Sequence, residues 1–148
     1  MPLVLPQSYS TGTLRIPLEP KTVGDHMRKR RLGLKMLQKD VAAQIGVDTT
    51  SIHNWETNVS QPSLEYMPAI IDFVGYNPLP AANTVAEKLV RQRTSLGLSQ
   101  KESAERLGVD AGTLGRWERG EREPTGVFLV RVKRFLRDGE AADARRAG

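Results

Sequence analysis

The sequence predicts an all-α fold made of two copies of one short helical unit. Residues 22–75 align with residues 84–137 without a gap, at a constant offset of 62. Within each copy, apolar residues recur at the three- and four-residue spacing of one helix face. Because a repeat at fixed register marks a duplicated supersecondary unit, we interpret the chain as two small tandem domains.

The residues shared by the two copies are mostly apolar or turn-forming, and they include both tryptophans of the chain. The identical pairs are Thr22/Thr84, Val23/Val85, Arg31/Arg93, Leu34/Leu96, Gln38/Gln100, Lys39/Lys101, Ala42/Ala104, Gly46/Gly108, Val47/Val109, Asp48/Asp110, Trp55/Trp117, Glu56/Glu118, Pro62/Pro124 and Phe73/Phe135. Ungapped identity at so many spaced positions is hard to obtain by chance.

The first three helices of each copy are predicted from spacing and caps. A first helix covers residues 23–34 and 85–96. The second begins at the capping box Ser99 to Glu102, whose counterpart at Leu37 lacks a cap side chain. Glycines, Gly46 and Gly108, end the second helices. Asp48 and Asp110 then act as N-caps of the third helices, which completes a helix-turn-helix motif in each copy.

A last amphipathic helix follows Pro62 and Pro124 in the two copies. Pro68 is tolerated only in a first turn, so the helix of the first copy either starts near Glu65 or is kinked. We expect a flexible extension over residues 1–20, a first domain over 21–76, a proline-containing linker over 77–83, a second domain over 84–137 and a flexible tail over 138–148.

Both copies resemble the Cro/repressor, or XRE-type, family of helix-turn-helix proteins. The resemblance rests on Leu34-Lys-Met-Leu-Gln38, Ala42, Ile45-Gly-Val47, Ile52-His-Asn-Trp-Glu56 and Pro62, and on the matching residues from Leu96 to Pro124. It implies two lambda-repressor-like five-helix bundles and the role of a bacterial or phage transcriptional regulator. It also implies that Arg31 pairs with Glu56, and Arg93 with Glu118, inside the fold.

The composition excludes some functions and favours others. The net charge of +5 suits a polyanionic partner. The chain has no cysteine, which removes disulfides and thiolate zinc sites and fits a reducing cytoplasm. We expect no signal peptide or membrane span, because Pro6 interrupts the first apolar run. His26 and His53 have no acidic cluster between them, so we expect no metal site. The sequence has no P-loop pattern and no Ser/His/Asp order, so we expect no cofactor and no enzyme activity.

The expected DNA contacts follow from the helix-turn-helix geometry. A glutamine and a lysine begin the second helix of each copy and are expected at phosphates, as are cations after the third helix of the second copy. The third helices are expected to read base edges in the major groove. The candidates are Gln38, Lys39, Thr49, Thr50, Ser51, His53, Asn54, Gln100, Lys101, Thr113, Arg116, Arg119 and Arg122. Their alternative role is that of solvated polar residues or, for threonine and serine, of residues that merely occupy the first turn of a helix.

Two departures from the family pattern concern the third helices. Ala111-Gly-Thr-Leu-Gly-Arg116 contains two glycines, which weaken a helix and indicate weaker base readout in the second copy. Asn58-Val-Ser60 replaces the family-like Gly120-Glu-Arg122, so the turn in the first copy is expected to differ.

The leading interpretation is a sequence-specific binder of double-stranded DNA that carries two recognition helices in one chain and can act as a monomer. The copies differ in charge: residues 22–75 have 6 Lys+Arg and 6 Asp+Glu, whereas residues 84–137 have 12 and 7. The alternative is a protein-interaction or antitoxin-like module with reduced DNA readout. A binding assay over a salt series distinguishes the two interpretations.

Overall fold

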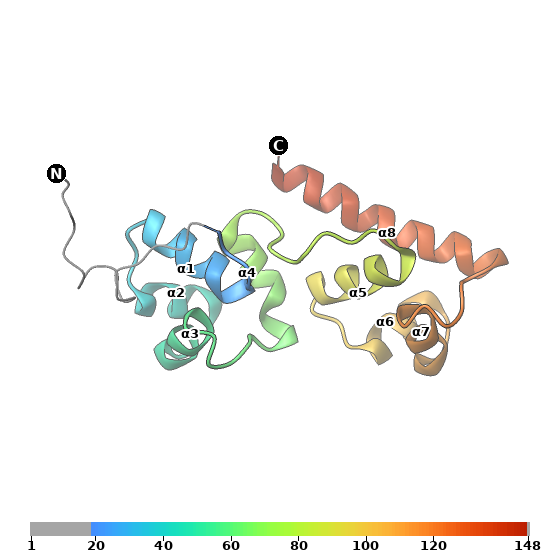
Figure 1. Ribbon diagram of the computed structural model, residues 1–148, viewed down its shortest axis with the longest axis horizontal. Coiled ribbons are helices and arrows are strands. Elements are labelled where there is room, and N and C mark those ends of the chain that lie inside the picture. The colour runs from blue at the N-terminus through green and yellow to red at the C-terminus, as the bar shows by residue number, and fades with distance from the viewer. Residues whose placement is uncertain (1–18, 148) are drawn as a thin grey trace. The chain divides into compact units, whose positions relative to one another are not determined.

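The computed structural model describes residues 19–147, and this part of the chain is entirely helical, with no strand (Figure 1). The all-α prediction is confirmed. The helices are α1 (Val23–Gly33), α2 (Gln38–Ile45), α3 (Thr49–Glu56), α4 (Met67–Val74), α5 (Val85–Ser95), α6 (Gln100–Leu107), α7 (Ala111–Glu118) and α8 (Gly126–Ala147), with a short 3-10 helix at Leu64–Tyr66. The extension predicted over residues 1–20 lies outside the described residues, except for its last two.

The chain divides into two compact units between Gln61 and Pro62. The first unit contains α1 to α3, and the second contains the 3-10 helix and α4 to α8. This division falls earlier than the domain boundary predicted at residue 76. Its physical basis is that α4, which belongs to the first copy by sequence, packs against α5.

The first unit is organised by short helices with well-defined caps. Thr22 and Asp25 form a reciprocal capping box at the start of α1, and Asp48 caps α3 through the backbone N–H of Ser51 at 2.7 Å. The helices α1 and α3 approach so closely that a Cβ added to Gly24 would overlap the backbone carbonyl of Trp55. Trp55 is 5% exposed, as predicted for the core.

The second unit repeats these features in α5, α6 and α7. The predicted capping box between Ser99 and Glu102 is present, and Asp110 caps α7. Trp117, also 5% exposed, joins a core with Leu89, Leu107 and Leu114. The predicted core residues Val47 and Val109 are only half-buried, because they lie in the turns that precede the third helices.

Each copy has four α-helices rather than five within the described residues. In the first copy the 3-10 helix Leu64–Tyr66 precedes α4, so Pro68 lies in the first turn of a helix that begins at Met67. Neither the earlier start nor the kink considered for Pro68 is therefore needed. The turn after α3 is also not different: Asn58 (φ 61°) and Gly120 (φ 73°) share the left-handed conformation, which asparagine tolerates.

The segment after Asp138, predicted as a flexible tail, is helical and continues α8 to Ala147 (red in Figure 1). Alanine, glutamate and arginine favour helix intrinsically, although the segment lacks apolar periodicity. Tertiary contacts add to this preference. Asp143 accepts a hydrogen bond from Arg91 of α5 at 2.8 Å, and Gly139 is buried so closely against Gln92 that a Cβ would overlap its amide.

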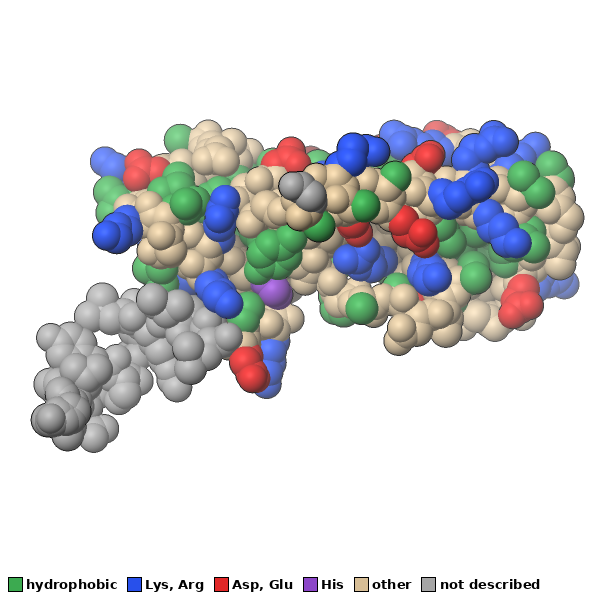
Figure 2. Space-filling model, turned by 90° about the horizontal axis from the view of Figure 1, so that it is seen from above, with side chains coloured by type: hydrophobic (Ala, Val, Ile, Leu, Met, Phe, Trp, Pro, Cys, Tyr) green, Lys and Arg blue, Asp and Glu red, His purple; other side chains and the backbone are tan. Residues whose placement is uncertain are grey.

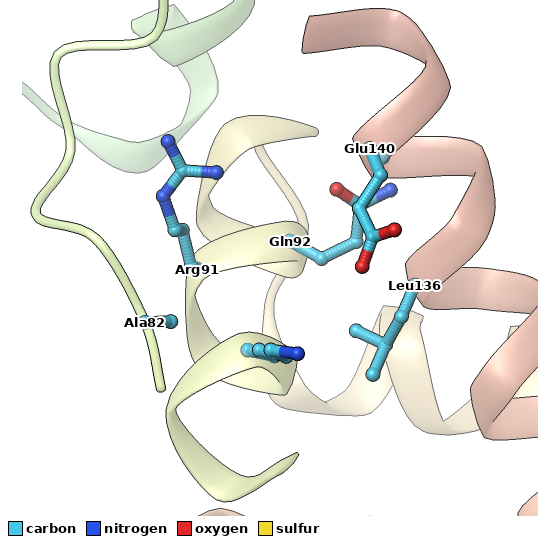
Figure 3. A pocket seen from close by; sticks show the side chains of 7 residues that line it. Ala82, Arg91, Gln92, Leu136 and Glu140 are labelled. Carbon is cyan, nitrogen blue, oxygen red and sulfur yellow. The ribbon is translucent and has the colours of Figure 1, made fainter. Parts of the chain in front are cut away.

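A cavity of about 140 Å³ lies between the linker, α5 and α8 in the second unit. Figure 3 shows Gln92 of α5 beside Glu140 and Leu136 of α8, with Ala82 of the linker on the other side. This volume is below the roughly 300 Å³ at which small-molecule pockets usually begin. None of the described helices combines the length and the apolar character needed to cross a membrane.

Candidate nucleic-acid interface

A buried ion pair joins the first and third helices in each copy, as the family resemblance implied. Arg31 Nε lies 2.7 Å from Glu56 Oε2, and Arg93 Nε lies 2.7 Å from Glu118 Oε2. Each arginine also donates through Nη2 to the second carboxylate oxygen, at 2.8 and 3.1 Å. This bidentate geometry holds the end of the third helix against the first helix.

The two predicted phosphate-binding glutamines are coupled to these ion pairs. The amide nitrogen of Gln38 donates to Oε1 of Glu56 at 3.1 Å, and that of Gln100 donates to Oε1 of Glu118 at 2.8 Å. The sequence did not predict this contact. Its effect is that the first residue of the second helix is fixed relative to the third helix in both copies.

The candidate residues of the first copy lie on two elements. Gln38 and Lys39 begin α2, where the lysine is exposed and the glutamine half-buried. The five candidates of α3 occupy its first six positions and are exposed or half-buried; they are Thr49, Thr50, Ser51, His53 and Asn54. The intervening Ile52 is fully buried. The helix thus has one core face and one polar face.

The second copy presents fewer side chains on its third helix. Arg116 is exposed, whereas Thr113 is half-buried and its hydroxyl donates to the carboxylate of its own cap, Asp110, at 3.1 Å. Lys101 is exposed at the second position of α6. Arg119 and Arg122 follow α7 and are also exposed. Despite its two glycines, α7 has the same length as α3, eight residues.

Two residues next to Arg119 were not predicted as part of the site. Glu121 accepts a hydrogen bond from Nε of Arg119. Gly115 is buried one turn before Arg119, and an ideal Cβ on it would lie 3.1 Å from Nη1 of that arginine. In sequence, Gly115 appeared only as a helix-weakening residue, because its proximity to Gln100 of the preceding helix becomes visible only in the folded chain.

The N-caps of the third helices are carboxylates at neutral pH. The backbone N–H of Ser51 lowers the pKa of Asp48, and the backbone N–H of Thr113 lowers the pKa of Asp110. Hydrogen bonds to the charged form favour that form. A negative charge also stabilises the N-terminus of a helix. The carboxylates therefore hold the first turn of each candidate recognition helix.

The cations of the described chain are unevenly distributed. Figure 2 shows Lys and Arg side chains gathered over the second unit on the face that carries α8. Within the second unit, the guanidinium carbon of Arg131 lies 5.6 Å from the ring centroid of Phe128, and Nη1 of Arg131 donates to the carbonyl of Leu107 at 3.2 Å. Residues 19–147 contain no group of three or more His, Asp or Glu side chains placed to bind a metal ion.

Comparison with known proteins identifies the repeated unit. A family model described as helix-turn-helix matches twice, at residues 27–79 and 89–137. Neither the curated proteins nor the solved structures give a match. The two matched segments contain the paired arginine and glutamate contacts described above, and together they cover more than half of the chain. The chain therefore belongs to the XRE-type helix-turn-helix family of DNA-binding proteins, as two tandem copies of that unit.

Proposed function

We propose that the chain is a sequence-specific transcriptional regulator that inserts α3 and α7 into the major groove of double-stranded DNA. The observation that carries the proposal is the hydrogen bond between Gln38 and Glu56, repeated between Gln100 and Glu118. It ties the residue expected at a phosphate to the helix expected at the bases. Phosphate contacts set the register in which a recognition helix meets base edges.

In this proposal the covalent tandem replaces the homodimer that many DNA-binding proteins form. Each copy of the repeat, residues 21–76 and 84–137, acts as one DNA-binding unit in this proposal, although α4 of the first copy packs against α5 of the second. The protein works in the cytoplasm. Because the two recognition helices differ in sequence, the proposed DNA site consists of two unlike half-sites. A single chain then supplies both contacts, and no second copy is required.

The proposed readout assigns different residues to bases and to phosphates. Asn54 can pair with adenine and Arg116 with guanine, while Thr49, Thr50, Ser51 and His53 border the same groove. Gln38, Lys39, Gln100 and Lys101 contact phosphates at the start of α2 and α6. Thr113 contributes mainly its methyl group, because its hydroxyl already donates to Asp110.

The experiment is a selection of bound duplexes from a random-sequence library, followed by affinity measurements over a salt series. The proposal expects an enriched sequence motif, bound much more tightly than random duplex, and an association constant that falls steeply with salt. Binding without an enriched motif contradicts sequence-specific regulation. Absence of duplex binding contradicts DNA recognition altogether and supports a protein-interaction module.

A further inference from the structure

We infer that Gly115 provides the space in which Arg119 and Gln100 together form a binding site for a DNA backbone phosphate, a site that the first copy lacks. The inference rests on the proposed function and deepens it. It assigns to Gly115, which no prediction placed in the interface, the role of a positioning residue.

The side chains of Arg119 and Gln100 both approach the open space beside Gly115. An ideal Cβ on Gly115 would lie 3.1 Å from Nη1 of Arg119 and 3.8 Å from both amide atoms of Gln100. The two polar groups therefore lie within 4 Å of the position that a side chain would occupy. Any larger residue in place of Gly115 would compete with the guanidinium for this space.

Arg119 and Gln100 both have N–H groups that the contacts within the protein described above do not use. Glu121 accepts from Nε of Arg119, and a guanidinium has further N–H groups on its two Nη nitrogens. Glu118 accepts from the amide nitrogen of Gln100, which carries two hydrogens. The side chain of Arg119 is 59% exposed. A phosphate can therefore accept hydrogen bonds from both residues.

The first copy is built differently at the same positions. His53 stands where the second copy has Gly115, and Thr57 stands where it has Arg119. The Thr57 hydroxyl donates to the backbone carbonyl of His53 at 2.8 Å. The first copy therefore has a bulky side chain at the position of Gly115 and no cation at the position of Arg119, although its Gln38 is held as Gln100 is.

Glu121 acts as the internal counter-ion of the site in the free protein. It accepts a hydrogen bond from Arg119, as a phosphate would. Its negative charge also repels a phosphate that approaches the same guanidinium. Arg119 lowers the pKa of Glu121, so this carboxyl group is charged at neutral pH. Replacing Glu121 by glutamine should strengthen DNA binding.

The test measures binding of a fluorescein-labelled, mixed-sequence DNA duplex between about 50 and 200 mM salt. Arg119→Ala should reduce the slope of log K against log salt by about 0.9, the loss of one phosphate contact. Gly115→His, which introduces the residue of the first copy, should give the same loss. In the Arg119→Ala background Gly115→His should cause no further change, and Glu121→Gln should no longer strengthen binding.

Two further variants and one DNA-free measurement complete the test. Gly112→His adds the same side chain to α7 away from Arg119, because only Asp110 lies near Gly112; in this control the effect of Arg119→Ala on the slope should remain. His53→Gly with Thr57→Arg should add one phosphate contact to the first copy. Gly115→His should also raise the pKa of Glu121, measured by carboxyl NMR, and Arg119→Ala should raise it as well. Circular dichroism checks that each variant is folded.

The outcomes separate the inference from the proposed function. If the wild-type protein binds duplex and Gly115→His keeps the full slope, the inference is overturned and the function stands. The same conclusion follows if Gly115→His weakens binding equally with and without Arg119. If the wild-type protein does not bind duplex, the proposed function is overturned, and the phosphate site with it.

Discussion

Gln38 and Glu56 are 18 residues apart in the chain, yet the amide nitrogen of Gln38 lies 3.1 Å from the carboxylate oxygen Oε1 of Glu56. The same carboxylate accepts two hydrogen bonds from Arg31. Only 1% of the Glu56 side chain is exposed, compared with 12% of the Arg31 side chain. One buried charge therefore links α1, α2 and α3, and its loss should affect both stability and the position of Gln38.

We predict that Arg31→Ala lowers the free energy of unfolding by about 3 kcal/mol, because it leaves the buried carboxylate of Glu56 uncompensated. Urea unfolding followed by tryptophan fluorescence measures the change. The double variant Arg31→Met/Glu56→Leu should recover much of the loss, since well-packed apolar residues can replace a buried ion pair. Arg119→Ala, which breaks an exposed ion pair, serves as the control. A loss of equal size in that control would contradict the prediction.

We predict that Ser103→Val stabilises the protein by about 1 to 3 kcal/mol, the usual penalty for a buried polar group without a partner. Ser103 is 1% exposed and its hydroxyl has no hydrogen-bond partner. The equivalent residue of the first copy, Val41, is fully buried. The matched variant Val41→Ser should destabilise the protein by a similar amount. Thermal unfolding of both variants checks the pair, and a lower midpoint for Ser103→Val would contradict it.

The helices could be predicted from sequence because their signals are local. Capping at Ser99 and Asp110 involves residues three positions apart, and the structure shows both caps as predicted. The helical tail and the surroundings of Gly115 could not be predicted in this way. The tail is held by a contact between Arg91 and Asp143, which are 52 residues apart, so no local pattern announces it.

The candidate site was predictable as a set of residues but not as a network. The spacing placed Gln100 at the start of α6, and the resemblance paired Arg93 with Glu118. That Gln100 donates to the same glutamate depends on how closely α6 and α7 pack, which no pattern in the sequence specifies. Glu121 was missed for a simpler reason: the segment Arg119-Gly-Glu-Arg-Glu123 has as many acidic as basic residues, and its sequence does not show which of them pair.

We predict that Lys35→Gly raises the free energy of unfolding by about 1 kcal/mol. Lys35 has a φ of 58°, in the left-handed region, where a side chain costs roughly 1 to 2 kcal/mol. The second copy has Gly97 (φ 72°) at the same position. Gly97→Ala should destabilise, because its Cβ would also crowd Pro68. Chemical unfolding measures both effects, and destabilisation by Lys35→Gly would show that its side chain makes an unrecognised stabilising contact.

We predict that the N-cap Asp110 contributes to acid sensitivity. Because its pKa is lower in the folded state than in the unfolded chain, its stabilising contribution is complete above the unfolded pKa of about 3.9. It is lost as the pH falls through the folded value. Asp110→Asn keeps a capping side chain without this titration. The variant should therefore lose less stability than the wild type below about pH 4, measured by urea unfolding over a pH series.

The wild type and Asp48→Asn provide the comparison for that experiment. Asp48 is the same cap in the first copy, and a hydrogen bond from Ser51 lowers its pKa as well. The two single variants should each reduce the acid dependence, and the double variant should reduce it further. An unchanged pH profile in the double variant would show that other carboxyl groups control acid unfolding.

The last prediction is a division of labour between the copies: the first mainly specifies the sequence, and the second mainly anchors the phosphates. Residues 22–75 have equal numbers of basic and acidic residues, 6 of each, whereas residues 84–137 have 12 and 7. The third helix of the first copy also carries more polar side chains. Asn54→Ala should therefore relax sequence preference while leaving the salt slope nearly unchanged, because a base contact releases few counter-ions.

Replacing Arg119 and Arg122 together by alanine should have the opposite effect. Both are exposed and follow α7, so their loss should reduce the salt slope and weaken binding to all duplexes about equally. Competition between the selected motif and single-base variants of it measures preference, and titration over salt measures the slope. Arg116→Ala separates the alternatives, because Arg116 is the exposed cation within α7 itself. If Arg116→Ala abolishes sequence preference while Asn54→Ala leaves it intact, the second copy is the reader, and the division of labour is reversed.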